Sequence, residues 1–93
     1  MTAEVSVRLI VSGRVQGVGF RWFVARHAQT LKVRGWVRNL PDGGVEVVAS
    51  GGDGAVAQLE ALVRRGPRFS SVENVDKLDV PHDMMYCKTF DIK

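Results

Sequence analysis

The sequence predicts a single α+β domain in which two helices pack on one face of an antiparallel sheet. Apolar residues recur with a period of two in some segments, which indicates strands, and with a helical period in others. These segments follow one another in the order strand, helix, strand, strand, helix, strand. That order is the ferredoxin-like split βαβ pattern (βαββαβ). Because a chain of 93 residues has the length of one domain, we expect one domain over residues 1–93.

The first half of the chain supplies a strand, a helix and a hairpin. The first strand is predicted from an alternation of apolar and polar residues, in which the apolar ones are Val5, Val7, Leu9 and Val11. Apolar residues at helical spacing then predict a helix over residues 21–32. Strands are expected at 33–39 and 45–50, joined by the turn sequence "LPDGG", in which proline fixes one dihedral and glycine accepts positive φ.

The second half supplies a helix and two strands. The second helix is expected to begin with Asp53 as its N-cap and to end at Gly66-Pro67. Its apolar face carries Val56, Leu59, Leu62 and Val63. Residues 70–80 are typical of a fourth strand and residues 87–93 of a short terminal edge strand, with a loop between them.

Composition limits the partners of the protein. With 13 basic and 10 acidic residues the net charge is +3, which favours anionic partners weakly, without the dense basic blocks of a nucleic-acid-binding protein. No apolar run approaches the roughly 20 residues of a membrane helix, and the amino-terminal residues lack the pattern of a signal peptide. We therefore expect a cytoplasmic monomer that binds neither nucleic acid nor membrane.

Residues that commonly hold metal ions are sparse. Cys87 is the only cysteine, which excludes an internal disulfide and a metal site built on cysteines. The two histidines are His27, expected to pack beside the apolar face of the first helix, and His82, in the loop before the terminal strand. They form no metal-ligand pattern, so we expect no metal and no cofactor.

The segment "GRVQGVGFRWF", residues 13–23, joins the first strand to the first helix. Gly17 and Gly19 tolerate positive φ, which lets the chain curl its amides around an anion. Arg21 offers a fixed charge and a planar fork for two phosphate oxygens. A plain strand-to-helix turn with solvated arginines is equally compatible with the glycine spacing, because short glycine patterns recur without function.

Element lengths bring a second residue to this loop. The first helix runs away from the loop for roughly 18 Å, and the next strand returns for roughly 20 Å. The two lengths nearly cancel, so Asn39 at the end of that strand is expected at the same end of the molecule as Arg21. The free amides at the amino end of the helix point into the same region, where they favour an anion.

Other phosphate and nucleotide motifs fit less well. A Rossmann loop needs a glycine where Trp22 stands, and a Walker loop needs a Gly-Lys-Ser/Thr sequence. An RNA-recognition domain has the same element order, and "GVGFRWF" imitates its aromatic motif. That motif belongs on the third strand, however, and the third strand predicted here has no aromatic residue.

Two segments resemble the signatures of the acylphosphatase family. "GRVQGVGFR" (13–21) is similar to the phosphate-binding signature of that family, and "GWVRNLPDGGVEV" (35–47) is similar to its second signature. The "GP" after the second helix also fits, and the resemblance covers nearly the whole chain. One difference is Leu40, because many members carry a threonine directly after the asparagine, and leucine cannot donate a hydrogen bond.

The resemblance implies hydrolysis of the carboxyl–phosphate bond of small-molecule acyl phosphates without a metal or other cofactor. Matched position by position, it implies that Arg21 binds the phosphate and that Asn39 holds the attacking water. It implies further that the phosphate oxygens are cradled by the main-chain amides of Val15, Gln16, Gly17, Val18, Gly19 and Phe20.

The residue types of the loop suit this chemistry. It contains no Cys, Ser, Asp or His placed to carry a phosphoryl group covalently, so direct attack by water remains. No general acid is evident either, which restricts the leaving group to one that departs unaided, such as a carboxylate. Two other functions stay open: a non-enzymatic phosphate- or RNA-binding module on the same fold, and an accessory domain of a carbamoyl-transfer enzyme.

Overall fold

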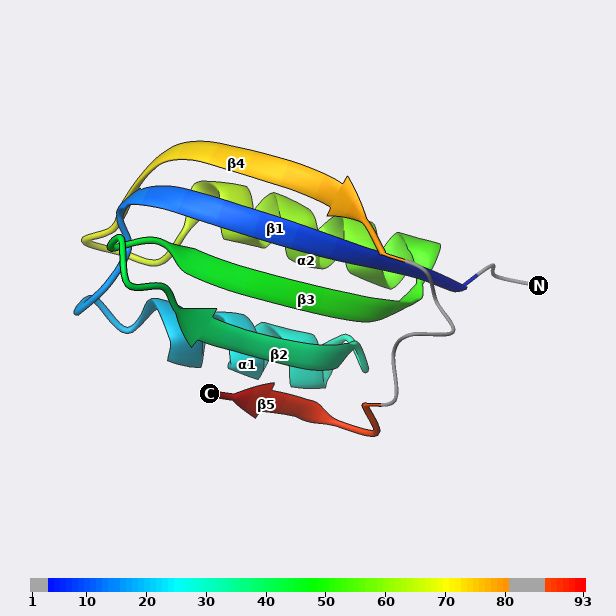
Figure 1. Cartoon of the computed structure of the whole chain (residues 1–93). Helices are drawn as coiled ribbons and strands as arrows, with labels where there is room; N and C mark the ends of the chain where they lie inside the picture. The colour runs from blue at the N-terminus through cyan, green and yellow to red at the C-terminus, as the bar shows by residue number, and fades with distance from the viewer. Residues whose placement is uncertain (1–3, 81–86) are drawn as a thin grey trace.

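The computed structural model describes residues 4–80 and 87–93 of the chain, so the loop that carries His82 lies outside the described residues. Figure 1 shows the succession of elements along the chain. They are β1 (Glu4–Arg14), α1 (Phe20–Thr30), β2 (Arg34–Asn39), β3 (Val45–Gly52), α2 (Asp53–Arg65), β4 (Ser71–Asp79) and β5 (Phe90–Ile92). The predicted order of the first six elements and the short terminal strand are confirmed.

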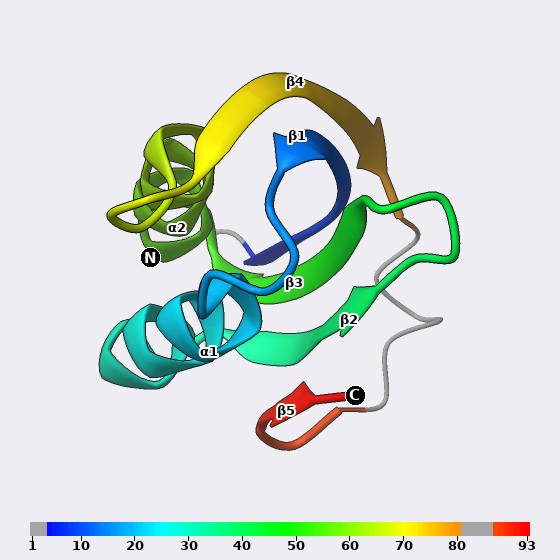
Figure 2. The ribbon, with the colours of Figure 1, turned by 90° about the vertical axis from the view of Figure 1, so that its left-hand side faces the viewer.

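The strands form one sheet in the order β4-β1-β3-β2-β5. The four predicted strands pair antiparallel with their neighbours, and β5 pairs parallel with β2. The ferredoxin-like α+β fold is therefore confirmed, with the refinement that the edge strand makes the sheet mixed. Both helices lie on the same face of the sheet, as expected (Figure 2).

The core lies between the helices and the sheet. Each helix buries one apolar stripe, and β1 and β3 turn alternate residues toward the helices. The buried residues include Val7, Leu9 and Val11 from β1, Phe20, Val24 and Ala28 from α1, Val45, Val47 and Ala49 from β3, and Val56, Leu59 and Val63 from α2. Full burial of a side chain of this size stabilises the fold by about 1.5–3 kcal/mol.

The expected N-cap of the second helix is wrong by one residue. Gly52 occupies the cap position with extended dihedrals, and Asp53 is the first helical residue, without a side-chain capping bond. The reason is that β3 continues to Gly52 and the helix follows without a connecting loop. The Asp53 carboxylate still lies in the first turn, where negative charge complements the helix dipole.

The opposite face of the sheet carries a buried carboxylate. The side chain of Glu46, on β3, is only 4% exposed and accepts hydrogen bonds from Arg8 Nε (2.7 Å), Arg38 Nε (2.6 Å) and Trp36 Nε1 (3.2 Å). Burial alone would raise the pKa of this carboxyl, but the bonds from Arg8, Arg38 and Trp36 outweigh it, so the pKa lies below its ordinary value. Glu46 thus joins β1, β2 and β3 through their side chains.

Candidate active site

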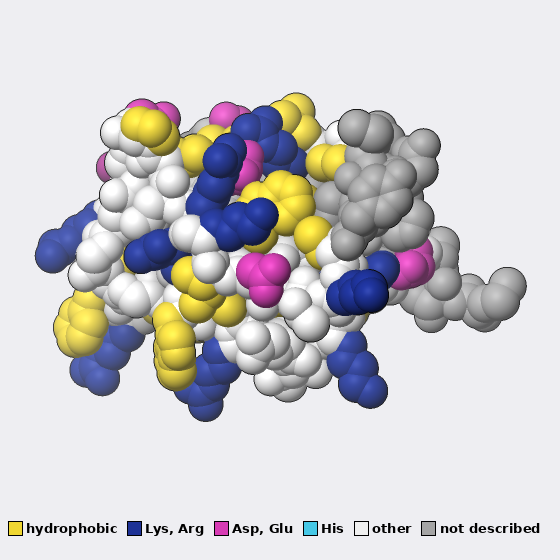
Figure 3. All heavy atoms as spheres, turned by 60° about the horizontal axis from the view of Figure 1, so that its bottom comes forward, with side chains coloured by type: hydrophobic (Ala, Val, Ile, Leu, Met, Phe, Trp, Pro, Cys, Tyr) yellow, Lys and Arg dark blue, Asp and Glu magenta, His cyan; other side chains and the backbone are white. Residues whose placement is uncertain are grey.

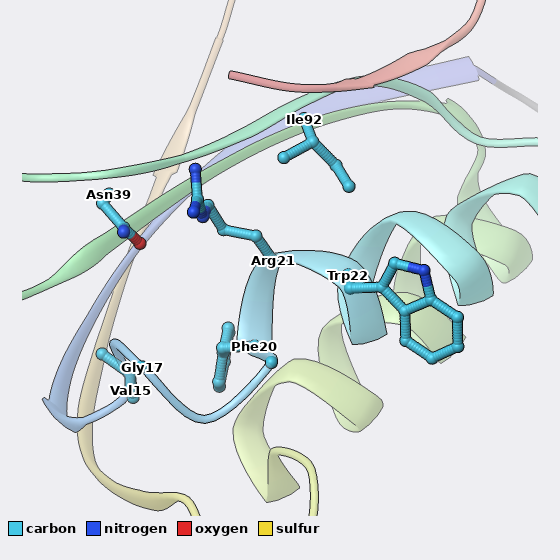
Figure 4. Close-up of a pocket in the computed structure, with 8 residues that line it drawn as sticks. Val15, Gly17, Phe20, Arg21, Trp22, Asn39 and Ile92 are labelled. Carbon is cyan, nitrogen blue, oxygen red and sulfur yellow. The ribbon is translucent and has the colours of Figure 1, made fainter.

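A pocket of about 250 Å³ opens where the glycine loop meets α1, beside the ends of β2 and β5 (Figure 4). Its lining residues are Val15, Gly17, Gly19, Phe20, Arg21, Trp22, Asn39 and Ile92. Of these described residues, Arg21 alone carries a charge. The one charge among the lining residues is therefore positive.

The loop owes its path to two glycines. Gly17 and Gly19 have φ angles of 75° and 76°, in the left-handed region, and a Cβ at either position would meet nothing within 4 Å. Backbone conformation, rather than lack of space, therefore requires glycine there. Gly19 is the N-cap of α1, and its carbonyl accepts the first helical bond, from the Phe23 amide at 3.0 Å.

The amino end of α1 supplies amides to the pocket wall. The first N–H groups of a helix have no carbonyl partner within it, and the helix dipole places partial positive charge at that end. Phe20 and Arg21 begin the helix, and both line the pocket. Such a helix end favours an anion.

Arg21 is held from the other side of the pocket. Its Nη1 donates a hydrogen bond to the main-chain oxygen of Lys93 at 2.9 Å, and the amide of Lys93 donates to the carbonyl of Val37 at 2.8 Å. The pairing of the last strand with β2 thus positions the guanidinium. A guanidinium has five N–H donors, so the bond to Lys93 leaves others to face an anion.

Asn39 ends β2, and Figure 4 shows its amide directed toward the guanidinium of Arg21. Both residues line the same pocket, so the expectation from helix and strand lengths is confirmed. A cation that can clamp an anion and a neutral amide that can orient a water molecule therefore face each other. The roles that the family resemblance implies for the two residues require that both lie in one cavity.

The expectation for Gln16 concerns its main-chain amide and stays a prediction, whereas the structure shows where its side chain binds. It does not line the pocket; its Nε2 donates to the carbonyl oxygens of Leu40 and Gly44, each at 2.8 Å. The side chain therefore ties the glycine loop to the turn that follows Asn39. Val18 does not line the pocket either, and packs against the core.

Sequence reasoning missed Trp22, Ile92 and the contribution of Lys93. The sequence did contain a sign that Trp22 is a candidate site residue. It lies off the apolar face of the predicted helix, and a large apolar side chain exposed to solvent is unusual. The sequence contains no comparable sign for Ile92 and Lys93, because they reach the pocket only through the parallel pairing of β5 with β2.

Two absences within the described ranges bear on the class of site. No group of three or more His, Cys, Asp or Glu side chains is placed to hold a metal ion. No helix there has the length and apolar character to cross a membrane.

The fold and the pocket define a class, that of small α+β proteins with a candidate anion site at the amino end of a helix. Comparison with known proteins narrows the class, since a sequence model of the acylphosphatase family matches residues 7–92. The chain belongs to the acylphosphatase family, a family of hydrolases, as its two signatures indicated.

Individual relatives agree with this assignment. The chain is 54% identical over 84 residues to an acylphosphatase of Nitratidesulfovibrio vulgaris (strain DP4), covering 89% of this chain and 84% of that protein. It is 48% identical to an acylphosphatase of Chlorobaculum tepidum over 96% of each. Its fold matches the crystal structure of acylphosphatase from Bacillus subtilis with a TM-score of 0.90 and 38% identity, covering 96% of this chain and 98% of that one.

Proposed function

We propose that the protein hydrolyses acyl phosphates in one step, with water attacking phosphorus and a carboxylate leaving. In this proposal Arg21 and the main-chain amides of residues 15–20 bind the phosphoryl group, and Asn39 orients the water. The observation that carries it is the arrangement of Arg21 and Asn39, whose side chains face each other at the amino end of α1 (Figure 4).

The positive groups suit phosphoryl transfer. Its transition state is loose, so catalysis consists largely of positioning and of stabilising charge on the equatorial oxygens. Arg21 supplies a fork that matches two of those oxygens, and amides at the helix end supply fixed dipoles. Together they provide the charge stabilisation that other phosphatases obtain from metal ions, so we propose a reaction that needs no cofactor.

The nucleophile in this proposal is water. None of the residues that line the described pocket is a Cys, Ser, Asp, Glu or His, and those are the usual covalent carriers of a phosphoryl group. An asparagine amide orients water by hydrogen bonding but is too weak a base to take its proton. The proton passes to a phosphate oxygen, so that acyl phosphate and water become carboxylate and phosphate.

The leaving group sets the substrate class. A carboxylate, whose conjugate acid has a pKa of about 4, departs without a proton donor, whereas an alkoxide needs a general acid. The pocket lining offers none. The enzyme is therefore expected to act on small acyl phosphates rather than on phosphate monoesters. We propose further that it acts as a monomer and does not bind nucleic acid.

The test is a comparison of two substrates in excess EDTA. Purified protein is assayed for phosphate release from acetyl phosphate and from phenyl phosphate, whose leaving group is a much stronger base. We expect turnover of acetyl phosphate, unaffected by EDTA, at least about a hundredfold faster than that of phenyl phosphate. Equal rates, or loss of turnover on chelation with recovery on added Mg²⁺, would contradict the mechanism. Phosphate binding without turnover would favour a binding module instead.

A further inference from the structure

The face of the sheet that the helices leave uncovered carries a group of cations. On this face Arg8, Arg38 and Lys93 surround the buried carboxylate of Glu46 and the ring of Trp36. Three cations around one carboxylate leave two positive charges unbalanced within the group. Figure 3 shows basic side chains gathered around apolar and acidic ones. We call these five residues the cationic patch, and none of them lines the candidate active site.

The two guanidinium groups of the patch are fixed and still have donors to offer. Arg8 binds Oε2 of Glu46 at 2.7 Å and Arg38 binds Oε1 at 2.6 Å, each through its Nε. Within the described residues, the Nη groups of both arginines make no hydrogen bond. The two arginine side chains are 40% and 50% exposed. Because the buried carboxylate already orders both forks, binding of a further carboxylate costs less side-chain entropy.

An exposed apolar side chain lies beside the patch and sets its length. Leu78 on β4 is 50% exposed and pairs with Arg8 on β1, so both side chains point to the same face of the sheet. In the order β4-β1-β3-β2, three strand intervals separate Leu78 from Arg38, which at about 4.8 Å each amounts to about 14 Å. Side chains on one side of an extended peptide repeat every 7 Å or so. Three of them, at positions i, i+2 and i+4, therefore cover this distance.

Trp36 distinguishes a peptide from a nucleic acid as the partner. Single-stranded nucleic acids bind largely by stacking their bases on exposed aromatic rings. The Nζ of Lys93 lies 4.8 Å from the centre of the Trp36 ring, and the Nε1 of that ring donates to Glu46 at 3.2 Å. The ring is thus engaged by Lys93 and Glu46 and is only half-buried. The cations therefore suit carboxylates better than nucleobases.

We propose that the cationic patch and Leu78 bind an extended acidic segment of a partner protein. Two carboxylates of the segment, at positions i and i+2, bind the guanidinium forks of Arg38 and Arg8, and an apolar side chain at i+4 packs on Leu78. Fork-to-carboxylate pairing supplies specificity, and the pairing is weakened by salt because the groups are exposed. The inference goes beyond hydrolysis and does not depend on it.

The probe is a fluorescein-labelled peptide of sequence Glu-Ala-Glu-Ala-Leu, whose affinity is measured by fluorescence anisotropy at low salt. A lysine in place of either arginine can keep the ion pair with Glu46 but has no fork left for a second carboxylate. We expect Arg8→Lys and Arg38→Lys each to lower the affinity about tenfold, and Leu78→Ser to lower it about threefold. Three substitutions on different strands keep the test valid if one variant folds poorly.

Arg64→Lys is the matched control. The Nε of Arg64 binds Oε2 of Glu60 at 3.1 Å, and Lys77 binds the other oxygen at 3.0 Å, which reproduces an arginine anchored on a shared carboxylate away from the patch. This variant should keep the parent affinity. The peptide Gln-Ala-Gln-Ala-Leu should bind at least about tenfold more weakly than the glutamate peptide.

Four outcomes would overturn the inference. They are a parent that does not bind the peptide, patch variants that keep the parent affinity, equal binding of the glutamine peptide, and tighter binding of oligothymidylate than of the glutamate peptide. The last would identify a nucleic acid as the partner. Acetyl phosphate turnover by Arg8→Lys and Arg38→Lys should equal that of the parent. A parent that binds the peptide without any turnover would overturn the proposed function and leave this inference in place.

Discussion

Gln16 donates a hydrogen bond from its side-chain amide to the carbonyl oxygen of Leu40, at 2.8 Å. Leu40 directly follows Asn39, so this bond links the glycine loop to the residue next to the proposed water-orienting asparagine. The same nitrogen donates to the carbonyl of Gly44 at 2.8 Å, on the far side of the turn. The contact uses the main chain of Leu40, so it does not depend on the side chain at this position.

Gln16→Met keeps the length of the side chain and removes both bonds. We expect a loss of about 1 kcal/mol in the free energy of unfolding. Two side-chain bonds are lost, but the carbonyl of Leu40 still accepts from the Gly43 amide and that of Gly44 from the Leu40 amide. We also expect kcat to fall about tenfold, with a smaller change in the affinity for inorganic phosphate. Urea unfolding, steady-state kinetics and calorimetry measure the three quantities. Gln29→Met, at an exposed position of α1, is the control, and an unchanged kcat in Gln16→Met would show that the link has no catalytic role.

Arg21→Lys tests the phosphate clamp. An ammonium cannot reproduce the planar fork on two phosphate oxygens, nor the bond of Nη1 to the main-chain oxygen of Lys93 in the same geometry. We expect kcat/KM for acetyl phosphate to fall about a hundredfold, with weaker binding of inorganic phosphate as well. Arg64→Lys, on the exposed side of α2, should remain fully active. Near-parent efficiency in a folded Arg21→Lys variant would remove Arg21 from this role.

The sequence predicted those parts of the fold that follow from local pattern. Alternation along β1 and the helical spacing of Phe20, Phe23 and Val24 are local, and so the elements and the buried faces could be anticipated. The approach of Asn39 to Arg21 was also predictable, because it needs only the lengths of α1 and β2. The N-cap of α2 was misplaced because aspartate is a favoured capping residue, whereas β3 runs to Gly52, two residues beyond its predicted end at residue 50.

The remaining parts of the site depend on contacts between distant segments. The direction of β5 cannot be read from three residues, since an edge strand pairs in either direction. Without that direction, Ile92 and Lys93 have no assigned place. The bonds of Gln16 likewise depend on how the glycine loop packs against the β2–β3 turn, which no local pattern encodes.

Glu46→Gln tests the buried carboxylate through the pH dependence of stability. Hydrogen bonds from Arg8 and Arg38 keep the pKa of Glu46 below its ordinary value of 4.5 despite burial. The unfolded chain therefore binds a proton at a higher pH than the folded protein, so stability rises with pH in that range. The contribution of Glu46 should be complete above pH 4.5 and disappear as the pH falls through the lowered value.

We expect Glu46→Gln to be less stable than the parent by about 2 kcal/mol at pH 7, because Arg8 and Arg38 lose their charged partner. The difference should shrink as the pH falls below 4.5 toward the lowered pKa of Glu46, because protonation then removes the charge that distinguishes glutamate from glutamine. Urea unfolding at several pH values measures it, with Glu73→Gln, at an exposed position of β4, as control. A difference that stays constant down to pH 3 would show that the charge of Glu46 does not contribute.

Asn39→Ala separates an enzyme from a binding module. If Asn39 only orients water, the variant should lose at least about a hundredfold in kcat and still bind inorganic phosphate about as tightly as the parent. The reason is that ground-state binding by Arg21 and the loop amides is separable from stabilisation of the transition state. Acetyl phosphate turnover and phosphate calorimetry measure the two effects, and circular dichroism confirms folding.

The position of Asn39 makes the result interpretable. Asn39 is exposed at the end of β2, where its backbone pairs with Val45, so truncation of its side chain leaves the sheet hydrogen bonds in place. Asn74 is an exposed asparagine on β4. Asn74→Ala therefore controls for the loss of a surface amide and should keep parent turnover.

Intact turnover in Asn39→Ala would remove Asn39 from the mechanism. Loss of phosphate binding in parallel with turnover would make it part of the anion cradle. We expect turnover to be lost and phosphate binding to remain, because the charge that holds the anion belongs to Arg21 and to the amino end of α1.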